Sequence, residues 1–129
     1  MATSVRARRR PARQATVLRA ALALLAMVGD AVDEAGAGLS ITAGLRPLVY
    51  ASVYSLGAET AVEPVILAGI QAVRDVTGVP PICAFDSPDA LGFFVETEIA
   101  GVPVQVTSRF TTEAGMAAAR ALLAPAVAA

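Results

Sequence analysis

The chain has 129 residues, of which 56% are hydrophobic, and its formal net charge is -1. This length predicts a single domain around one core and excludes two independent domains. Histidine is absent. Because histidine is the usual general base near neutral pH and the commonest metal ligand, its absence argues against whole classes of hydrolase and zinc chemistry. The lone Cys83 cannot form an internal disulfide, which favours a reducing, cytoplasmic location.

Positive charge is concentrated at the N-terminus. Six of the ten arginines lie within the first 19 residues, which contain no acid, and the remainder of the chain carries all eleven carboxylates. The pattern predicts a disordered arginine-rich arm over residues 1–15, one folded domain over 16–124 and a frayed end over 125–129. Three roles stay open for the arm: it would bind an acidic protein partner, it would bind nucleic acid by neutralising phosphates, or it would be a solvated terminus with no specific role. The residues expected to make these contacts are Arg6, Arg8, Arg9, Arg10 and Arg13.

The first expected element is a helix from about Thr16 to Glu34. At about 100° per residue, most of its charged residues fall on one side and its large apolar residues on the other, as in a surface helix that packs on a core. Gly36 and Gly38 supply the expected helix terminators. The predicted buried side comprises Val17, Leu18, Ala21, Leu24, Leu25, Val28 and Val32.

The same segment also has the features of an export signal. It has a basic start, an apolar run from Ala20 to Gly29 and a small-residue cleavage sequence at 35–37. The angular separation of polar and apolar residues, and the acids just before the cleavage sequence, favour the packed helix. The apolar run is also shorter than the ~20 residues that span a bilayer, so no membrane partner is expected.

The next segments predict a hairpin, a second helix and a short strand. Strands at Leu39–Ala43 and Leu48–Ser55 are joined by a turn at Gly44–Pro47. Thr60 and Glu63 form a capping-box pattern that begins the second helix, which ends at Gly78. The short strand, at Ile82–Phe85, is expected at a sheet edge. The predicted buried positions of the second helix are Val62, Val65, Ile66, Gly69, Ile70, Val73 and Val76.

The C-terminal half predicts a second hairpin and a last helix. Leu91–Ile99 and Val102–Phe110 alternate around Ala100–Gly101, which pairs Ile99 with Val102. Thr111 or Thr112 would cap a helix that ends near Leu123. The apolar face of the hairpin comprises Phe93, Val95, Ile99, Val102, Val104 and Val106, and the opposite face Phe94, Glu96, Glu98, Gln105, Thr107 and Arg109.

The predicted order is α-β-β-α-(β)-β-β-α, an α+β fold with an antiparallel four- or five-stranded sheet and helices packed on one face. This order recurs in roadblock-like and other small scaffolds. The hairpin FFVETEIAGVPVQVTSRF, the strand LVYASVYSL and the helix before them resemble small α+β proteins of GC-rich bacterial genomes, phages and integrative elements. That resemblance implies an accessory role and carries over no catalytic or ligand residue.

Three groups of side chains contain residue types that occur in catalytic or metal-binding sites. Glu96 and Glu98 would lie about 7 Å apart on one strand face, but exposed strand carboxylates commonly serve solubility. Cys83 is expected to be a small buried hydrophobe. The segment Asp86–Asp89 is expected to form a turn with local caps rather than a cation loop. The sequence therefore predicts no enzyme, no cofactor and no metal; a small enzyme using the carboxylates or Cys83 is the alternative.

The predicted function is protein binding or assembly. If the two hairpins lie side by side, Tyr50, Tyr54 and Phe94 share the outer sheet face, which with the sheet edge would contact a protein partner or a second copy. Stacking of single-stranded bases is an alternative, but Glu96 and Glu98 would repel phosphates there. Two further hypotheses stay open: a third element covers the tyrosines within the monomer, or the chain is a nucleic-acid-associated accessory protein that uses the arm.

Overall fold

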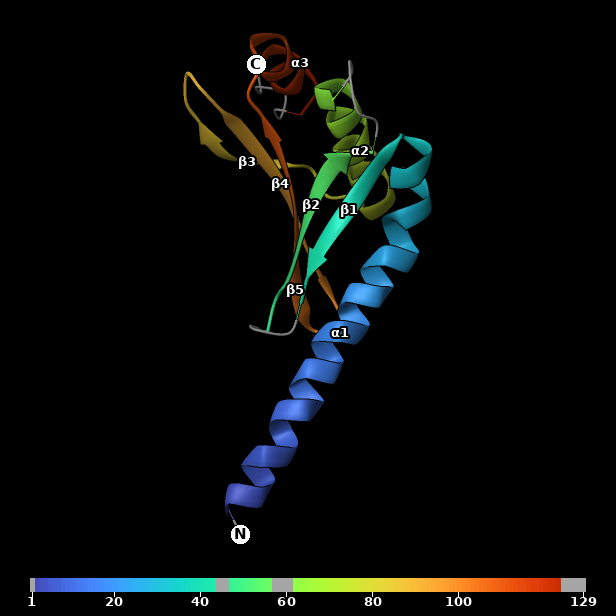
Figure 1. The fold of residues 1–129 in the computed structure, drawn as a ribbon, viewed down its shortest axis with the longest axis vertical. Helices are drawn as coiled ribbons and strands as arrows, with labels where there is room; N and C mark the ends of the chain where they lie inside the picture. Colours follow the sequence, from blue (N-terminus) through green and yellow to red (C-terminus); the bar gives the residue numbers. More distant parts are fainter. Residues whose placement is uncertain (1, 44–46, 57–61, 124–129) are drawn as a thin grey trace.

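The computed structural model describes the backbone of residues 2–43, 47–56 and 62–123, and within these ranges the side chains from residue 14 onward. The helices and strands follow the predicted order, including the short strand before the second hairpin (Figure 1). Their bounds are α1 (Ala2–Glu34), β1 (Ala37–Thr42), β2 (Val49–Ser55), α2 (Val62–Thr77), β3 (Ile82–Asp86), β4 (Leu91–Ile99), β5 (Val102–Phe110) and α3 (Glu113–Leu123).

The five strands form one mixed sheet in the order β1-β2-β5-β4-β3. The predicted hairpins are confirmed, and Ile99 pairs with Val102 as expected. The prediction of a wholly antiparallel sheet is wrong, because β2 pairs with β5 in parallel. The reason lies in α2, which returns the chain to the starting end of β2, so that β3 runs in the same direction as β2. Two further reversals, into β4 and then β5, make β5 parallel to β2.

Helices cover one face of the sheet, as predicted. Along β2, Val49, Ala51 and Val53 are buried under the helices, whereas Tyr50 and Tyr54 are exposed on the other face. The same alternation runs along β5, where Val102, Val104 and Val106 are buried. Burying these rows of apolar side chains is the main favourable contribution to the fold, at about 25 cal/mol per Å² removed from water.

Helix α1 is longer than the sequence predicted. It begins at Ala2 instead of near Thr16, so its backbone continues through residues 2–15, which we expected to be a disordered arm. Alanine and arginine are good helix formers and favour the extension, whereas Pro11 within it cannot donate a helix hydrogen bond and opposes it. The N-terminal part of the helix projects beyond the strands (Figure 1). The side chains of residues 1–13, including the five arginines of the arm, lie outside the described residues, as do residues 125–129.

The core-facing side of α1 is narrower than predicted. Leu18 and Leu25 were expected in the core, but they are 50% and 47% exposed. The helix ends as predicted, since Gly36 adopts a positive φ of 83° and its N–H donates to the carbonyl of Asp33 at 2.9 Å. The buried residues of the helix are Val17, Ala20, Ala21, Leu24, Val28 and Val32.

The hydropathy of α1 corrects the expectation about a membrane span. Over Gln14–Glu34 the helix is long and apolar enough to cross a membrane by length and composition alone. The shortness of the apolar run therefore does not exclude a span. What favours a packed helix is the burial of Val17, Leu24 and Val28 against the rest of the domain.

Helix α2 packs on the sheet through its middle. Gly69, Ile70 and Val73 are buried as predicted, but Val62 in the first turn and Val76 in the last are each 43% exposed. Gly69 permits the close approach, because a Cβ there would lie 2.6 Å from Cγ1 of Val53 and 2.9 Å from Cβ of Ala37.

We expect Gly69→Ala to destabilise the protein by up to about 2 kcal/mol, because overpacking typically costs about 1–3 kcal/mol and the gain in helix propensity returns only about 1 kcal/mol. Urea denaturation measures the change in the free energy of unfolding. Stabilisation by Gly69→Ala would contradict the close packing of α2 on β2.

Candidate functional site: the outer sheet face

The outer face of the sheet carries all three aromatic residues predicted to form an interface. Tyr50 and Tyr54 on β2 are 44% and 43% exposed, and Phe94 on β4 is half-buried. Strand pairing places them on one face, because Ser52, between the two tyrosines, is opposite Thr107, and Thr107 is opposite Phe94. The hypothesis that another element covers the tyrosines is wrong for the described part of the chain.

The three aromatic residues surround a polar centre instead of forming one stack. Phe94 lies two strands from Ser52, about 10 Å at the usual strand spacing. Between them, the hydroxyl groups of Ser52 and Thr107 are hydrogen-bonded at 3.2 Å, and Thr107 Oγ1 also donates to the carbonyl of Ala51 at 3.2 Å. These bonds satisfy the polar groups at the centre, which can therefore be covered by a partner at little cost.

Two residues that the sequence analysis did not single out add apolar area beside Phe94. Ile82 of β3 pairs with Phe94 and is 50% exposed, and Phe85 is 44% exposed with its ring over Gly92. The ring occupies the place that a Cβ at Gly92 would take. A glycine inside a strand marks such a close approach, so Gly92 was the signal that could have indicated this contact.

The tyrosine half of the face has a similar arrangement. The ring of Tyr54 lies over Gly38, the residue that pairs with it on β1. Leu56, just after β2, is 58% exposed, and its Cδ2 would lie 3.1 Å from a Cβ at Gly38. Gly38 was expected to be a helix terminator, whereas in the structure it lies in β1 and makes room for the tyrosine ring.

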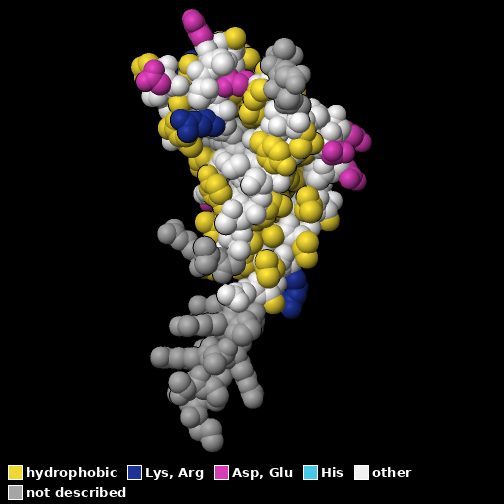
Figure 2. Space-filling model, viewed as in Figure 1, with side chains coloured by type: hydrophobic (Ala, Val, Ile, Leu, Met, Phe, Trp, Pro, Cys, Tyr) yellow, Lys and Arg dark blue, Asp and Glu magenta, His cyan; other side chains and the backbone are white. Residues whose placement is uncertain are grey.

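Charged residues share this face with the aromatic residues. Glu96 and Glu98 are exposed, as is Arg109 on β5, and all three point to the side opposite the helices, as predicted. In Figure 2, hydrophobic side chains are spread along the strands, with acidic side chains toward the upper rim and on the right-hand side where α1 ends. The described residues include no group of three or more histidine, cysteine, aspartate or glutamate side chains that could hold a metal ion.

Cys83 does not occupy the buried position that was expected. It is exposed, and its thiol lies 3.5 Å from the carbonyl oxygen of Phe85. The prediction failed because all five residues of β3 are exposed, so this edge strand has no side that packs into the core. The register of β3 against β4 also shifts between Cys83 and Phe85.

The turn after β3 is closed by local hydrogen bonds, as predicted. The N–H of Ser87 donates to the carbonyl of Ala90 at 2.9 Å, and the N–H of Ala90 donates to Ser87 Oγ at 3.2 Å. Asp86 accepts a hydrogen bond from Arg120 of α3 at 2.7 Å. This bond lowers the pKa of Asp86 and raises that of Arg120. The Asp86 carboxylate is thus engaged by an arginine.

Glu63 links the N-terminal ends of α2 and α3. Its carboxylate accepts hydrogen bonds from the backbone N–H of Thr111 at 2.7 Å and of Thr112 at 3.1 Å, and also from both threonine hydroxyls. Thr112 Oγ1 in turn accepts from the N–H of Gly115 at 3.0 Å, so Thr112 is the N-cap of α3. The capping-box prediction was therefore incomplete: Thr60 lies outside the described residues, and Glu63 stabilises the start of a different helix.

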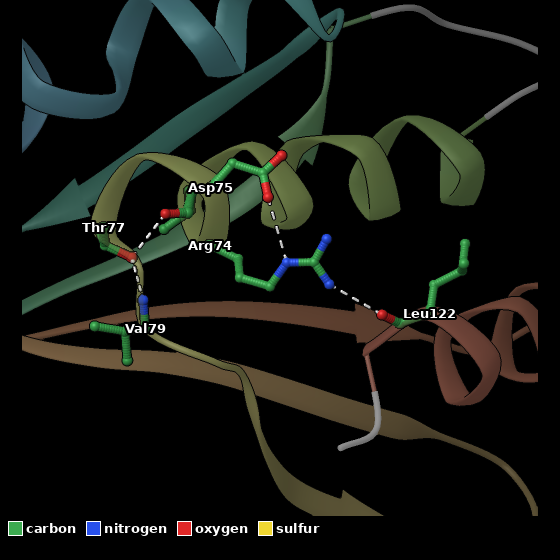
Figure 3. A network of polar contacts seen from close by, with 6 residues as sticks. Arg74, Asp75, Thr77, Val79 and Leu122 are labelled. Carbon is green, nitrogen blue, oxygen red and sulfur yellow. Dashed lines mark hydrogen bonds and ion pairs between the residues drawn. The ribbon is translucent and has the colours of Figure 1, made fainter. Parts of the chain in front are cut away.

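The C-terminal ends of α2 and α3 are linked by Arg74 (Figure 3). Its Nη1 donates to the carbonyl of Leu122 at 3.1 Å, and its Nε lies 3.5 Å from Asp75 Oδ1. Thr77 closes the end of α2 by donating to the carbonyl of Val73 and accepting from the N–H of Val79. With Glu63 at one end and Arg74 at the other, the two helices lie side by side in the same direction.

A pocket of about 700 Å³ lies between the starts of these two helices. Its walls are mainly apolar, and the Glu63 carboxylate at its side is held by the threonine hydrogen bonds. Burial raises the pKa of Glu63, but the hydrogen bonds from Thr112 and Thr111 together lower it below 4.5. The group is therefore a carboxylate at neutral pH. The lining residues are Val62, Glu63, Pro64, Leu67, Thr112, Ala114, Gly115 and Ala118.

Comparison of the chain with protein-family models, curated proteins and solved structures gives no match.

We expect Glu63→Gln to lower the free energy of unfolding at pH 7 by about 1 kcal/mol, the typical contribution of a helix cap. Since the folded-state pKa of Glu63 is lowered below 4.5, its stabilisation is present above that pH and is lost as the pH falls through the folded-state value. The difference between the two proteins should therefore shrink in acid, as measured by urea denaturation from pH 7 to pH 3. Glu98→Gln is the control; a pH-independent difference for Glu63→Gln would contradict the carboxylate contact.

Proposed function

We propose that this protein is a non-enzymatic binding or assembly module that contacts another protein through its outer sheet face. The observation that carries the proposal is the exposure of large apolar side chains on a face that no described element covers. They lie on rigid strands whose other side forms the core, so they form a preformed surface. The side chains are Tyr50, Tyr54, Leu56, Ile82, Phe85 and the half-buried Phe94.

The composition of this face suits a protein partner better than a nucleic acid. Aromatic residues and arginine are enriched at protein interfaces, and here Tyr50 and Tyr54 lie on the same face as Arg109. Glu96 and Glu98 place two carboxylates on that face, where they would repel a phosphate backbone. The carboxylates can remain hydrated at the rim of a protein interface.

The candidate catalytic groups of the chain favour binding over catalysis. The sequence has no histidine, and the Glu63 carboxylate is engaged by two threonines. Cys83 lies on an exposed edge strand, and Glu96 and Glu98 lie on an open face.

We further propose that the module is cytoplasmic and that its arginine-rich arm (Arg6, Arg8, Arg9, Arg10 and Arg13) contacts an acidic partner.

Photo-crosslinking in the cells of origin tests the interface. A photoreactive phenylalanine analogue placed at Tyr50, Tyr54 or Phe94 in turn should give a covalent adduct with the same protein, because the three positions share one face. Tyr54→Glu should reduce the adduct formed from position 50 at least tenfold, since a carboxylate would be buried unpaired in the interface.

Leu122 on α3 is the control position, because it is 51% exposed and lies on a helix. It should give no such adduct. Circular dichroism of each variant shows that the fold is retained. Equal labelling from position 122, or different proteins captured from positions 50 and 54, would contradict a specific interface on the sheet.

Nucleic-acid binding by the arm is the second candidate function, and the concentration of six arginines in the first 19 residues favours it. Fluorescence anisotropy with a labelled DNA duplex over a salt series measures it. If the arm neutralises phosphates, affinity should fall steeply with salt, and replacing the five arm arginines with glutamine should abolish most of that dependence. Equal binding by the substituted and the unsubstituted full-length protein would eliminate this function for the arm.

A further inference from the structure

The solvent-facing side of α1 carries a row of leucines that the fold leaves exposed. Leu18, Leu22 and Leu25 are 50%, 67% and 47% exposed. They are spaced four and then three residues apart, and Gly29 follows after four more. This is the 3.5-residue repeat of a helix pair, in which alternate spacings of three and four keep one seam facing a partner helix. We call these four residues the leucine seam.

The leucine seam is separate from the core-facing side of the helix. Leu24, Val28 and Val32 bury that side against the domain, and no described residue covers the seam. Three large leucines exposed to water in one row are unfavourable. Pairing with another helix would recover about 25 cal/mol per Å² of apolar surface removed from water. The seam is also distinct from the outer sheet face, because α1 packs on the opposite, core-facing side of the sheet.

Charge along α1 indicates which helix would cover the seam. All six N-terminal arginines lie at or before Arg19, and the acids Asp30, Asp33 and Glu34 lie in the last turns. In Figure 2, a basic side chain lies near the lower end of the described part of this helix and acidic side chains lie at its upper end. A second α1 laid antiparallel would bring the basic end of each helix to the acidic end of the other, whereas a parallel pair would bring like charges together.

We propose that α1 pairs with α1 of a second copy of this chain, in an antiparallel arrangement through the leucine seam. The spacing sets the register: Leu22 faces the partner's Leu25, and Leu18 faces the partner's Gly29. Gly29 has no side chain of its own, and Leu25 of the same helix lies beside it, since a Cβ at Gly29 would be 3.2 Å from Cδ1 of Leu25. The facing leucine would pack against both. The projection of the N-terminal part of α1 beyond the strands leaves it free to lie along the second molecule (Figure 1).

The size of the seam predicts the strength of the pair. From Leu18 to Gly29 the seam covers about three helical turns, or roughly 17 Å at 1.5 Å per residue, which is short for a coiled coil. Attraction between the charged ends must therefore contribute, and the dimer is expected to weaken as salt is raised.

Sedimentation equilibrium of the full-length protein tests the pairing. The unsubstituted protein should be a dimer at low salt, and Leu22→Glu should weaken dimerisation at least tenfold because it places a charge in the seam. Leu122→Glu on α3 and Tyr50→Glu on the outer sheet face should leave the dimer intact. A monomer at all concentrations, or a dimer lost on Tyr50→Glu and kept on Leu22→Glu, would overturn the proposal.

Disulfide trapping tests the orientation in a Cys83→Ser background. Antiparallel pairing predicts a cross-linked dimer when the Leu18→Cys and Gly29→Cys proteins are mixed and oxidised, and little dimer from Leu18→Cys alone. Efficient cross-linking of Leu18→Cys to itself would show a parallel pair and overturn the assignment. Vesicles of anionic lipid test the membrane as the alternative occupant of the seam. If the protein is monomeric and binds these vesicles, and Leu22→Glu abolishes the binding, the dimer proposal is overturned.

Discussion

The structure depends on the burial of one face of the five-stranded sheet beneath helices α1 and α2. Every strand except β3 contributes apolar side chains to the core between the sheet and the helices. The helices contribute Leu24, Val28, Ile70 and Val73. Because strand side chains alternate, burying one face necessarily turns the other toward solvent. The outer face, with its tyrosines and its carboxylates, is thus a direct consequence of where the core lies.

Polar contacts between helices α2 and α3 fix the position of α3 at the rim of the domain. Glu63 and Arg74 hold α3 beside α2 through its N-terminal N–H groups and its last carbonyls, which a helix cannot satisfy internally. These contacts are partly exposed, so each contributes far less than the core. Together they orient α3, whose Arg120 also donates a hydrogen bond to Asp86, the last residue of the edge strand β3. The helical layer and the weakly packed edge are therefore connected by polar contacts.

Helix α1 shows how far periodicity alone predicts burial. The angular pattern correctly placed Val17, Leu24, Val28 and Val32 in the core, but it also placed Leu18 and Leu25 there. A helix resting on a flat sheet buries only a narrow stripe, and apolar residues beside that stripe stay in water. Sequence pattern alone cannot tell how wide the contact will be. That width decides whether leucines belong to the core or to a surface for another molecule.

The sequence by itself determined the element order, the register of the β4–β5 hairpin and the faces of its strands, because these follow from local turn chemistry and the two-residue period. It also indicated that Tyr50, Tyr54 and Phe94 would share a face. Only the tertiary structure decided the parallel pairing of β2 with β5, the exposure of Cys83, the contact of Glu63 with Thr111 and Thr112, and the rings of Phe85 and Tyr54 over glycines. Each of these features either joins residues that are separated in the sequence or depends on which side chains pack over a strand. Contacts of this kind leave no periodic pattern in the sequence.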